Sequence, residues 1–136
     1  MKKLIVLVLA LVCVLGLVGC KNEHTEDMTN TNRFLPNTQK VQVVFYSGSD
    51  VHEWELAQDE IEDWTNWLNG LTLEQVSFER GTAPETTHTS GTRYIFNVNG
   101  EEVQMQYINE GADGVYLFVN ELWYKINNPT EPFNKY

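Results

Sequence analysis

Apolar residues recur with a helical period in one stretch of the chain. Ile61, Trp64, Leu68 and Leu71 fall at positions i, i+3, i+7 and i+10, and the positions between them carry mostly carboxylates and amides. One stripe of such a helix is buried and the rest faces water. The spacing therefore predicts an amphipathic helix over residues 58–69.

Both ends of this helix have recognisable signals. Leu56 and Ile61 stand where the N′ and N4 residues of a hydrophobic staple belong, and Glu60 stands at N3. The N-cap is then Ala57, where serine or threonine is usual. Gly70 suits a left-handed C′ position just beyond the last turn.

The rest of the chain beyond residue 38 alternates with the period of two that is typical of strands. Asn99-Gly100 predicts a type I′ hairpin, and Asn120-Glu121 predicts a second tight turn, with glutamate where glycine is expected. Strands are expected at residues 40–47, 72–79, 92–98, 102–108, 114–119 and 122–126. Residues 51–56, after a turn, could continue the first of these strands.

These elements predict an α+β fold in the order β-α-β-β-β-β-β. One helix packs on one face of a largely antiparallel sheet of five to six strands, because turns this short leave no room for parallel crossovers. By analogy of architecture, the arrangement is similar to cystatin-like and inhibitor-type folds, which by itself implies no activity.

The N-terminus has the layout of an export signal. Two lysines follow Met1, residues 4–18 are apolar, and Gly19 precedes Cys20. The apolar run is short for a spanning helix, which needs about 20 residues. The sequence Leu17-Val18-Gly19-Cys20 resembles the lipobox of bacterial lipoproteins, in which the cysteine receives a diacylglycerol and the chain is cut just before it.

That resemblance implies a location and a division of the chain. Residues 1–19 are then a signal peptide, residues 20–38 an acylated cysteine with a polar tether, and residues 39–136 a single domain. The protein is expected at the cell membrane, lipid-anchored (a palmitate-type anchor) on the extracytoplasmic face, where acyl chains on Cys20 hold it. Phe34 and Leu35 interrupt the polar tether, so we expect them to dock on the domain.

The net charge of the chain limits the classes of partner that it is expected to bind. The chain carries nine basic and nineteen acidic residues, and loss of Lys2 and Lys3 with the signal leaves a net charge of −12. Such a surface repels nucleic acid, so we expect no nucleic-acid partner. The exported domain has no thiol besides Cys20, which excludes a disulfide or thiolate metal site. No cofactor is expected, and the protein is expected to be a monomer.

Two short motifs resemble a protein family. The chain has Trp67-Leu68 with Leu71 in the helix, and Trp123-Tyr124-Lys125-Ile126 with Asn128-Pro129 near its end. This pattern is similar to small uncharacterised lipoproteins of Gram-positive bacteria, in which a helix precedes a β-meander. The motifs imply a shared architecture and bring no activity with them.

No motif predicts catalysis or a metal centre. His52-Glu53 begins like a zinc-protease helix, but Leu56 stands where the second histidine belongs. Residues 109–114 resemble a calcium loop, but position twelve is Asn120 rather than a bidentate glutamate. Ser77 begins the nearest match to a Ser-x-x-Lys nucleophile, which ends in an arginine. We therefore expect that the protein is not an enzyme and that the helix carboxylates form a solvated face.

Aromatic residues and one loop supply the candidate binding residues. Trp64, Phe96, Tyr107 and Phe118 suit the core, whereas other rings could stack on a sugar or fill a partner's pocket. The longest polar loop, residues 80–92, adds an arginine and a histidine to the candidates. The candidate binding residues are Trp54, Trp67, Trp123, Arg80 and His88.

The sequence therefore favours a lipid-anchored binding module for a protein or peptide partner at the cell envelope. Two alternatives stay open at this point: a binder of cell-wall sugar or a small solute through exposed tryptophan and carboxylates, and an enzyme of unrecognised type. An exposed apolar aromatic patch would favour a protein partner. A cleft with a tryptophan floor and carboxylate walls would favour a sugar.

Overall fold

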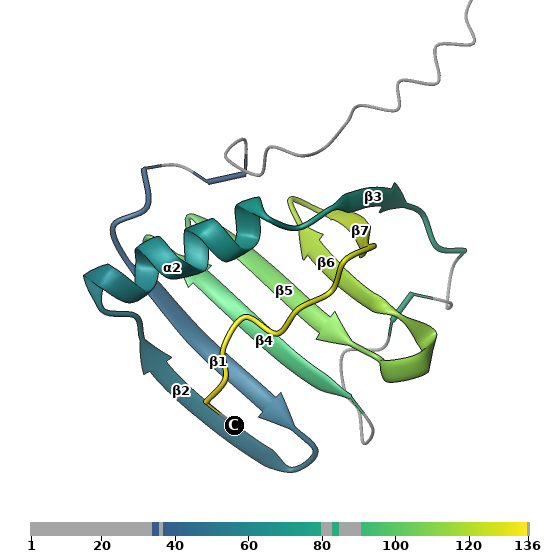
Figure 1. The fold of residues 1–136 in the computed structure, drawn as a ribbon, viewed down its shortest axis with the longest axis horizontal. Coiled ribbons are helices and arrows are strands. Elements are labelled where there is room, and N and C mark those ends of the chain that lie inside the picture. The colour runs from purple at the N-terminus through teal and green to yellow at the C-terminus, as the bar shows by residue number, and fades with distance from the viewer. Residues whose placement is uncertain (1–33, 36, 80–82, 85–90, 136) are drawn as a thin grey trace, which may run out of the picture.

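The computed structural model describes residues 34–35, 37–79, 83–84 and 91–135. Within these residues, seven strands form one antiparallel sheet with a single α-helix (Figure 1). The elements are β1 (Val41–Ser47), β2 (Asp50–Glu55), α2 (Gln58–Asn69), β3 (Leu73–Val76), β4 (Thr92–Val98), β5 (Val103–Asn109), the short 3-10 helix η2 (Gly111–Asp113), β6 (Val115–Val119) and β7 (Leu122–Ile126). The predicted α+β class is confirmed.

The predicted order β-α-β-β-β-β-β lacks one strand, and the predicted count of five to six strands falls short of the seven observed. Ser47 pairs with Asp50, and Gly48 between them has a φ of 58°, so the chain reverses within two residues. Residues 51–55 therefore run back along β1 as part of a separate strand, β2, instead of continuing it. The order is β-β-α-β-β-β-β-β.

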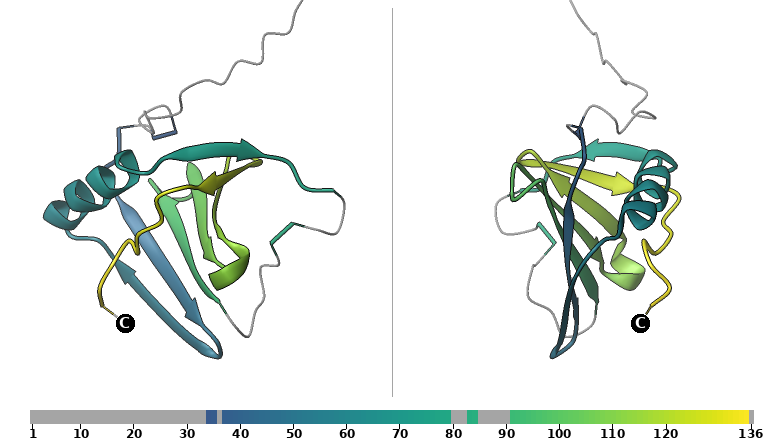
Figure 2. Two further views of the ribbon diagram at one scale, coloured as in Figure 1. Left: turned by 45° about the vertical axis from the view of Figure 1, so that its right-hand side comes forward. Right: turned by 90° about the vertical axis from the view of Figure 1, so that its left-hand side faces the viewer.

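The strands lie in the order β2-β1-β4-β5-β6-β7-β3. Strands β4 to β7 form a meander of hairpins, while β1 joins β4 and β3 joins the far edge beside β7. Helix α2 lies against one face of the sheet, which we call the inner face (Figure 2). The chain after β7 crosses the same inner face and ends near β1 and β2 (Figures 1 and 2).

Alternation places the core on the inner face. Trp64 of α2 is 1% exposed, and its ring packs 5.2 Å from that of Phe96 of β4. The predicted burial of Trp64, Phe96 and Tyr107 is confirmed. Phe34 is also buried and its ring lies 5.4 Å from that of Tyr124, so the expected docking of this residue on the domain is confirmed.

Phe118 is not a core residue, contrary to the prediction. Strand β6 turns Val115, Leu117 and Val119 inward, where all three are buried. Because successive side chains of a strand point to opposite faces, Tyr116 and Phe118 lie on the outer face, where both are half-buried.

The predicted start of the helix is confirmed. Ala57 is the N-cap, with φ −68° and ψ 165°, and no side chain accepts a hydrogen bond from the first turn. Glu60 reaches back so that its Oε2 accepts a hydrogen bond of 2.9 Å from the backbone N–H of Ala57. Leu56 and Ile61 of the staple are both buried in the core.

The predicted left-handed conformation of Gly70 was wrong. Gly70 is the C-cap itself, in the right-handed helical region at φ −81° and ψ −9°. The side chain of Asn128 does the capping, since its Nδ2 donates to the Gly70 carbonyl at 2.8 Å and its Oδ1 accepts from the N–H of Thr72. The helix end is thus satisfied by a residue after β7, which makes the left-handed turn unnecessary.

The two hairpin predictions had different outcomes. Asn120 and Glu121 both have positive φ, 51° and 64°, between the paired residues Val119 and Leu122, which confirms a tight turn. At Asn99 the two-residue turn was wrong, because Val98 pairs with Val103 and the loop has four residues. The Asn99 side chain instead accepts hydrogen bonds from the N–H groups of residues 39 and 40.

Candidate functional site

Trp67, a predicted binding residue, contacts the chain's own C-terminal segment (residues 127–135). Its indole Nε1 donates to the carbonyl of Thr130 at 3.0 Å and lies 3.1 Å from the Thr130 hydroxyl. The ring also makes an edge contact with Tyr107, with centroids 5.7 Å apart. Trp67 therefore holds this segment against the inner face.

Trp54, the second predicted binding residue, contacts the same segment from β2. Its ring packs edge-on against Phe133 at 5.5 Å, and the Nζ of Lys135 lies 5.6 Å from its centroid. Phe133 also lies 5.9 Å from the ring of Tyr94 on β4. The aromatic inner face between β2 and β5 is thus covered by the chain's own C-terminus.

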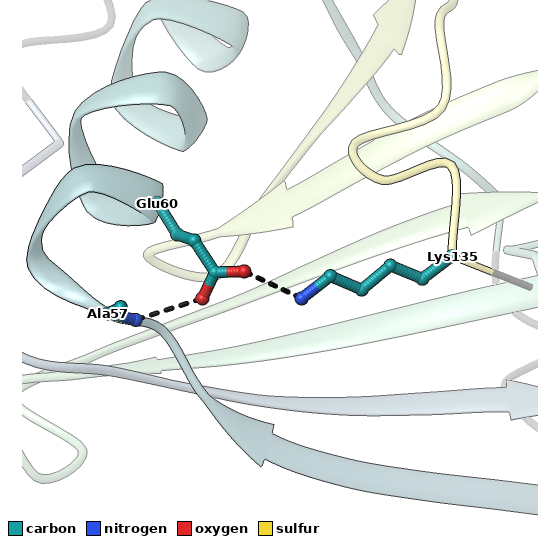
Figure 3. Close-up of polar contacts among 3 residues, drawn as sticks. All are labelled: Ala57, Glu60 and Lys135. Atoms are coloured by element: carbon teal, nitrogen blue, oxygen red, sulfur yellow. Dashed lines mark hydrogen bonds and ion pairs between the residues drawn. The ribbon is translucent and has the colours of Figure 1, made fainter.

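Lys135 fastens the end of this segment to the helix. Its Nζ lies 2.6 Å from the Oε1 of Glu60, whose other oxygen accepts from Ala57 (Figure 3). The hydrogen bond from Lys135, and then the one from the Ala57 N–H, hold the pKa of Glu60 below its ordinary value. One carboxylate therefore serves both the start of α2 and the C-terminal segment.

Tyr94 and Tyr107 of the sheet form a polar cluster with Glu131 of the C-terminal segment. Asn109 Nδ2 donates to Glu131 Oε1 at 2.9 Å, and the Tyr107 hydroxyl donates to the Thr130 carbonyl at 3.4 Å. Burial first and the Glu131 carboxylate second raise the pKa of Tyr94 to about 12, and burial with the same charge also raises the pKa of Tyr107. Both phenols therefore stay protonated at neutral pH, so the Tyr107 hydroxyl can donate its hydrogen bond to Thr130.

Trp123, the third predicted binding residue, lies on the opposite side of the sheet. Its partner in the register of β3 is Val76, and its ring lies 4.7 Å from that of Phe118 and 5.5 Å from that of Phe78. Phe78 also contacts Tyr116 at 5.5 Å. We call Phe78, Tyr116, Phe118 and Trp123 the outer aromatic cluster, and all four are half-buried.

The outer aromatic cluster was only partly predictable. Trp123 was a candidate from the sequence, but Phe118 was expected in the core, and Tyr116 and Phe78 were not candidates. The signal that could have found them is the alternation of β6, in which residues 115, 117 and 119 are uniformly aliphatic and 116 and 118 are aromatic. The cross-strand pairing that brings Phe118 beside Trp123 is a tertiary feature.

The remaining predicted residues lie outside the described part of the chain. These are Arg80 and His88 of the polar loop, and Cys20 with the signal and lipobox around it. Their roles stay predictions.

The described residues contain neither a cluster of metal ligands nor a helix that could span a membrane. No group of three or more His, Cys, Asp or Glu side chains there is arranged to hold a metal ion. No helix in residues 34–135, gaps excluded, is long and apolar enough to cross a membrane.

Comparison with known proteins adds no relative from which a role could be transferred. No protein-family model, no curated protein and no solved structure matches the chain.

Proposed function

We propose that the protein is a lipid-anchored, extracytoplasmic module that binds a protein or peptide partner at the cell envelope and has no catalytic activity of its own. The outer aromatic cluster is the observation that carries the binding role. The lipobox sequence ending at Cys20 supports the anchor.

The cluster has the composition of a protein-binding hot spot. Aromatic rings bring a large contact area with few rotatable bonds, so that they lose little conformational entropy when a partner covers them. The rings of Phe78 and Phe118 pack against Trp123 at 5.5 Å and 4.7 Å, which restricts the movement of its indole before a partner arrives. Trp54 and Trp67 contribute less to this proposal, because they already contact the C-terminal segment.

A helix across an antiparallel sheet is also the arrangement of cystatin-like and inhibitor-type folds. This analogy of architecture is compatible with a protein-binding role, but it names no partner.

Crosslinking from the native membrane tests the binding role. A hot-spot tryptophan contributes at least about 2 kcal/mol, so Trp123→Ala should weaken partner capture by roughly thirtyfold or more. Tyr46→Ala is the matched control, because Tyr46 is a half-buried ring on the same face, held under Arg93 at 4.4 Å and outside the cluster. Equal capture by the wild type and Trp123→Ala would refute the proposal. Saturable binding of soluble cell-wall sugar fragments, lost in Trp123→Ala, would favour the sugar-binding alternative instead.

A separate variant tests the anchor. Cys20→Ser should release the domain from membranes or leave the precursor unprocessed, because the acyl chains supply the membrane affinity. Fractionation of cells followed by immunoblotting measures this, and a variant as firmly bound and as well processed as the wild type would contradict the lipobox interpretation.

A further inference from the structure

Strand β2 forms one edge of the sheet. Its partner is β1, and no strand in the described residues pairs with its other side. In Figure 1 it is the outermost strand at the lower left, at the end of the sheet remote from β3.

The hydrogen-bonding pattern shows which backbone groups of β2 point away from the sheet. The N–H of Leu56 donates to the carbonyl of Val41 at 2.9 Å, and bonded and non-bonded pairs alternate along an antiparallel ladder. His52 and Trp54 therefore exchange hydrogen bonds with β1. The N–H and C=O groups of Val51, Glu53 and Glu55 point outward.

Strand β2 has none of the backbone features that usually close a sheet edge. It is six residues long, contains no proline and pairs with β1 in continuous register without a bulge. Val51, on its outer face, is 52% exposed, one of the most exposed large apolar side chains in the described residues. The opposite edge, β3, has only four residues.

The acidic charge around β2 determines which kind of strand can pair with its open edge. Seven of the nineteen acidic residues lie between Asp50 and Asp63, and no lysine or arginine lies among them. Lys40 and Lys135 reach Glu55 and Glu60 from elsewhere in the chain, but Glu53 is exposed on the strand itself. A second copy of β2 that paired antiparallel about Glu53 would place two glutamates opposite each other, which is unfavourable.

We propose that the open edge of β2 binds an extended basic segment of a partner protein by adding it to the sheet as an eighth strand. The outward backbone groups of Val51, Glu53 and Glu55 supply the hydrogen bonds. Lysine or arginine at alternate positions of the segment lies on the outer face beside Glu53, and the apolar residues between them lie on the inner face beside Trp54. This surface is separate from the outer aromatic cluster and adds a second, charge-selective contact to the proposed binding module.

The test uses the full isotope-labelled chain in uncharged detergent micelles and a short synthetic peptide in which lysine alternates with valine. Adding this peptide should shift the amide resonances of Val51, Glu53 and Glu55 and slow their hydrogen exchange, because these amides become hydrogen-bonded. A peptide with glutamate in place of lysine should not bind. The proposal would be overturned if amide hydrogen exchange slowed at other residues but not on β2, or if both peptides bound equally well.

Comparison of Glu53→Pro with Glu53→Gln separates strand addition from simple charge attraction, because both remove the carboxylate and only the proline also removes the outward N–H. Since β1 does not use this N–H, the sheet should persist in Glu53→Pro, while peptide binding should be lost beyond the effect of Glu53→Gln. Gln75→Pro on the opposite edge strand, β3, is the matched control. The N–H of Asn127 donates to the Thr72 carbonyl, so by the same alternation the N–H of Gln75 points away from β7 and makes no bond within the sheet. This control variant should leave peptide binding unchanged.

A milder variant keeps the test decisive if Glu53→Pro fails to fold. Glu53→Gln should weaken binding by up to about fivefold, the range of one exposed ion pair, and the difference should shrink at high salt. Peptide binding that Glu53→Gln leaves unchanged, or dimerisation of the chain through this edge in sedimentation experiments, would refute the proposal. Trp123→Ala should leave peptide binding intact, so this proposal and the proposed function can fail independently.

Discussion

The start of α2 lacks one interaction that a single hydroxyl would supply. Ala57 already has the extended backbone conformation of an N-cap and is exposed, so Ala57→Ser needs no backbone change and buries no polar group. Glu60 already provides the reciprocal half of a capping box by accepting the Ala57 N–H. In Ala57→Ser the new Oγ should accept the N–H of Glu60, completing the box.

The size of the effect follows from the cost of removing such a cap. Serine, threonine, asparagine or aspartate caps replaced by alanine cost about 0.5–2 kcal/mol, typically about 1. Ala57→Ser should therefore raise the free energy of unfolding by about 1 kcal/mol. For a domain of roughly 100 residues, this corresponds to an increase in Tm of about 4–8 °C.

Urea unfolding followed by tryptophan fluorescence measures the change. The gain should shrink when Glu60→Ala is added, because the reciprocal half of the box is then missing. Glu60→Ala also breaks the contact with Lys135, so Lys135→Met serves as the control and should leave the gain from Ala57→Ser intact (Figure 3). A neutral or destabilising Ala57→Ser with an unchanged m-value would refute the assignment of Ala57 as an unfilled N-cap.

Three further predictions concern the helix end, the core and the polar cluster. Gly70→Ala should stabilise the domain by about 0.4–1 kcal/mol in thermal melts, because the backbone there is right-handed and an added Cβ meets its nearest atom at an ordinary 3.4 Å. Gly100→Ala, at φ +71°, should destabilise it, and equal effects of the two changes would contradict this reasoning. Tyr124→Phe should raise the free energy of unfolding by about 1 kcal/mol, since the buried Tyr124 hydroxyl has no hydrogen-bond partner in the described part of the chain. A lower free energy of unfolding in urea titrations would show instead that this hydroxyl is hydrogen-bonded. The folded-state pKa of Tyr94 is raised from 10 to about 12, so its contribution to stability is fully present below pH 10 and is lost as the pH rises towards 12. Glu131→Gln removes a charge that raises this pKa and should flatten the alkaline loss of stability, and an unchanged slope would mean that Glu131 does not act on Tyr94.

The features that the sequence alone determined are those that depend on near neighbours. The limits of α2 follow from the spacing of Ile61, Trp64 and Leu68 and from the staple at its start, because a helix brings residues three and four apart onto one face. The tight turn at Asn120 and Glu121 follows from the short interval between two alternating segments. The unfavourable charge balance for nucleic acid follows from composition.

The candidate site depended far more on the tertiary structure. Three tryptophans looked alike in the sequence, yet Trp54 and Trp67 contact the C-terminal segment on the inner face and Trp123 joins the outer aromatic cluster. The hydrogen bond between Trp67 and Thr130 joins residues 63 positions apart. Contacts between such distant segments leave no pattern in the local sequence, because neither segment contains residues that identify its partner before the sheet forms.

The same distinction explains where the sequence-based predictions were wrong. Gly70 has the residue type of a left-handed cap, but Asn128 arrives from 58 positions away and satisfies the helix end in a right-handed conformation. Residues 51–55 could extend β1 or reverse along it, and reversal gives β2 a complete ladder of hydrogen bonds with β1. Local propensity decided which segments are helix or strand. Long-range pairing decided the strand order, the open edge of β2 and the face on which each ring lies. The physical reason is that only the assembled sheet leaves particular backbone groups and side chains without a neighbour.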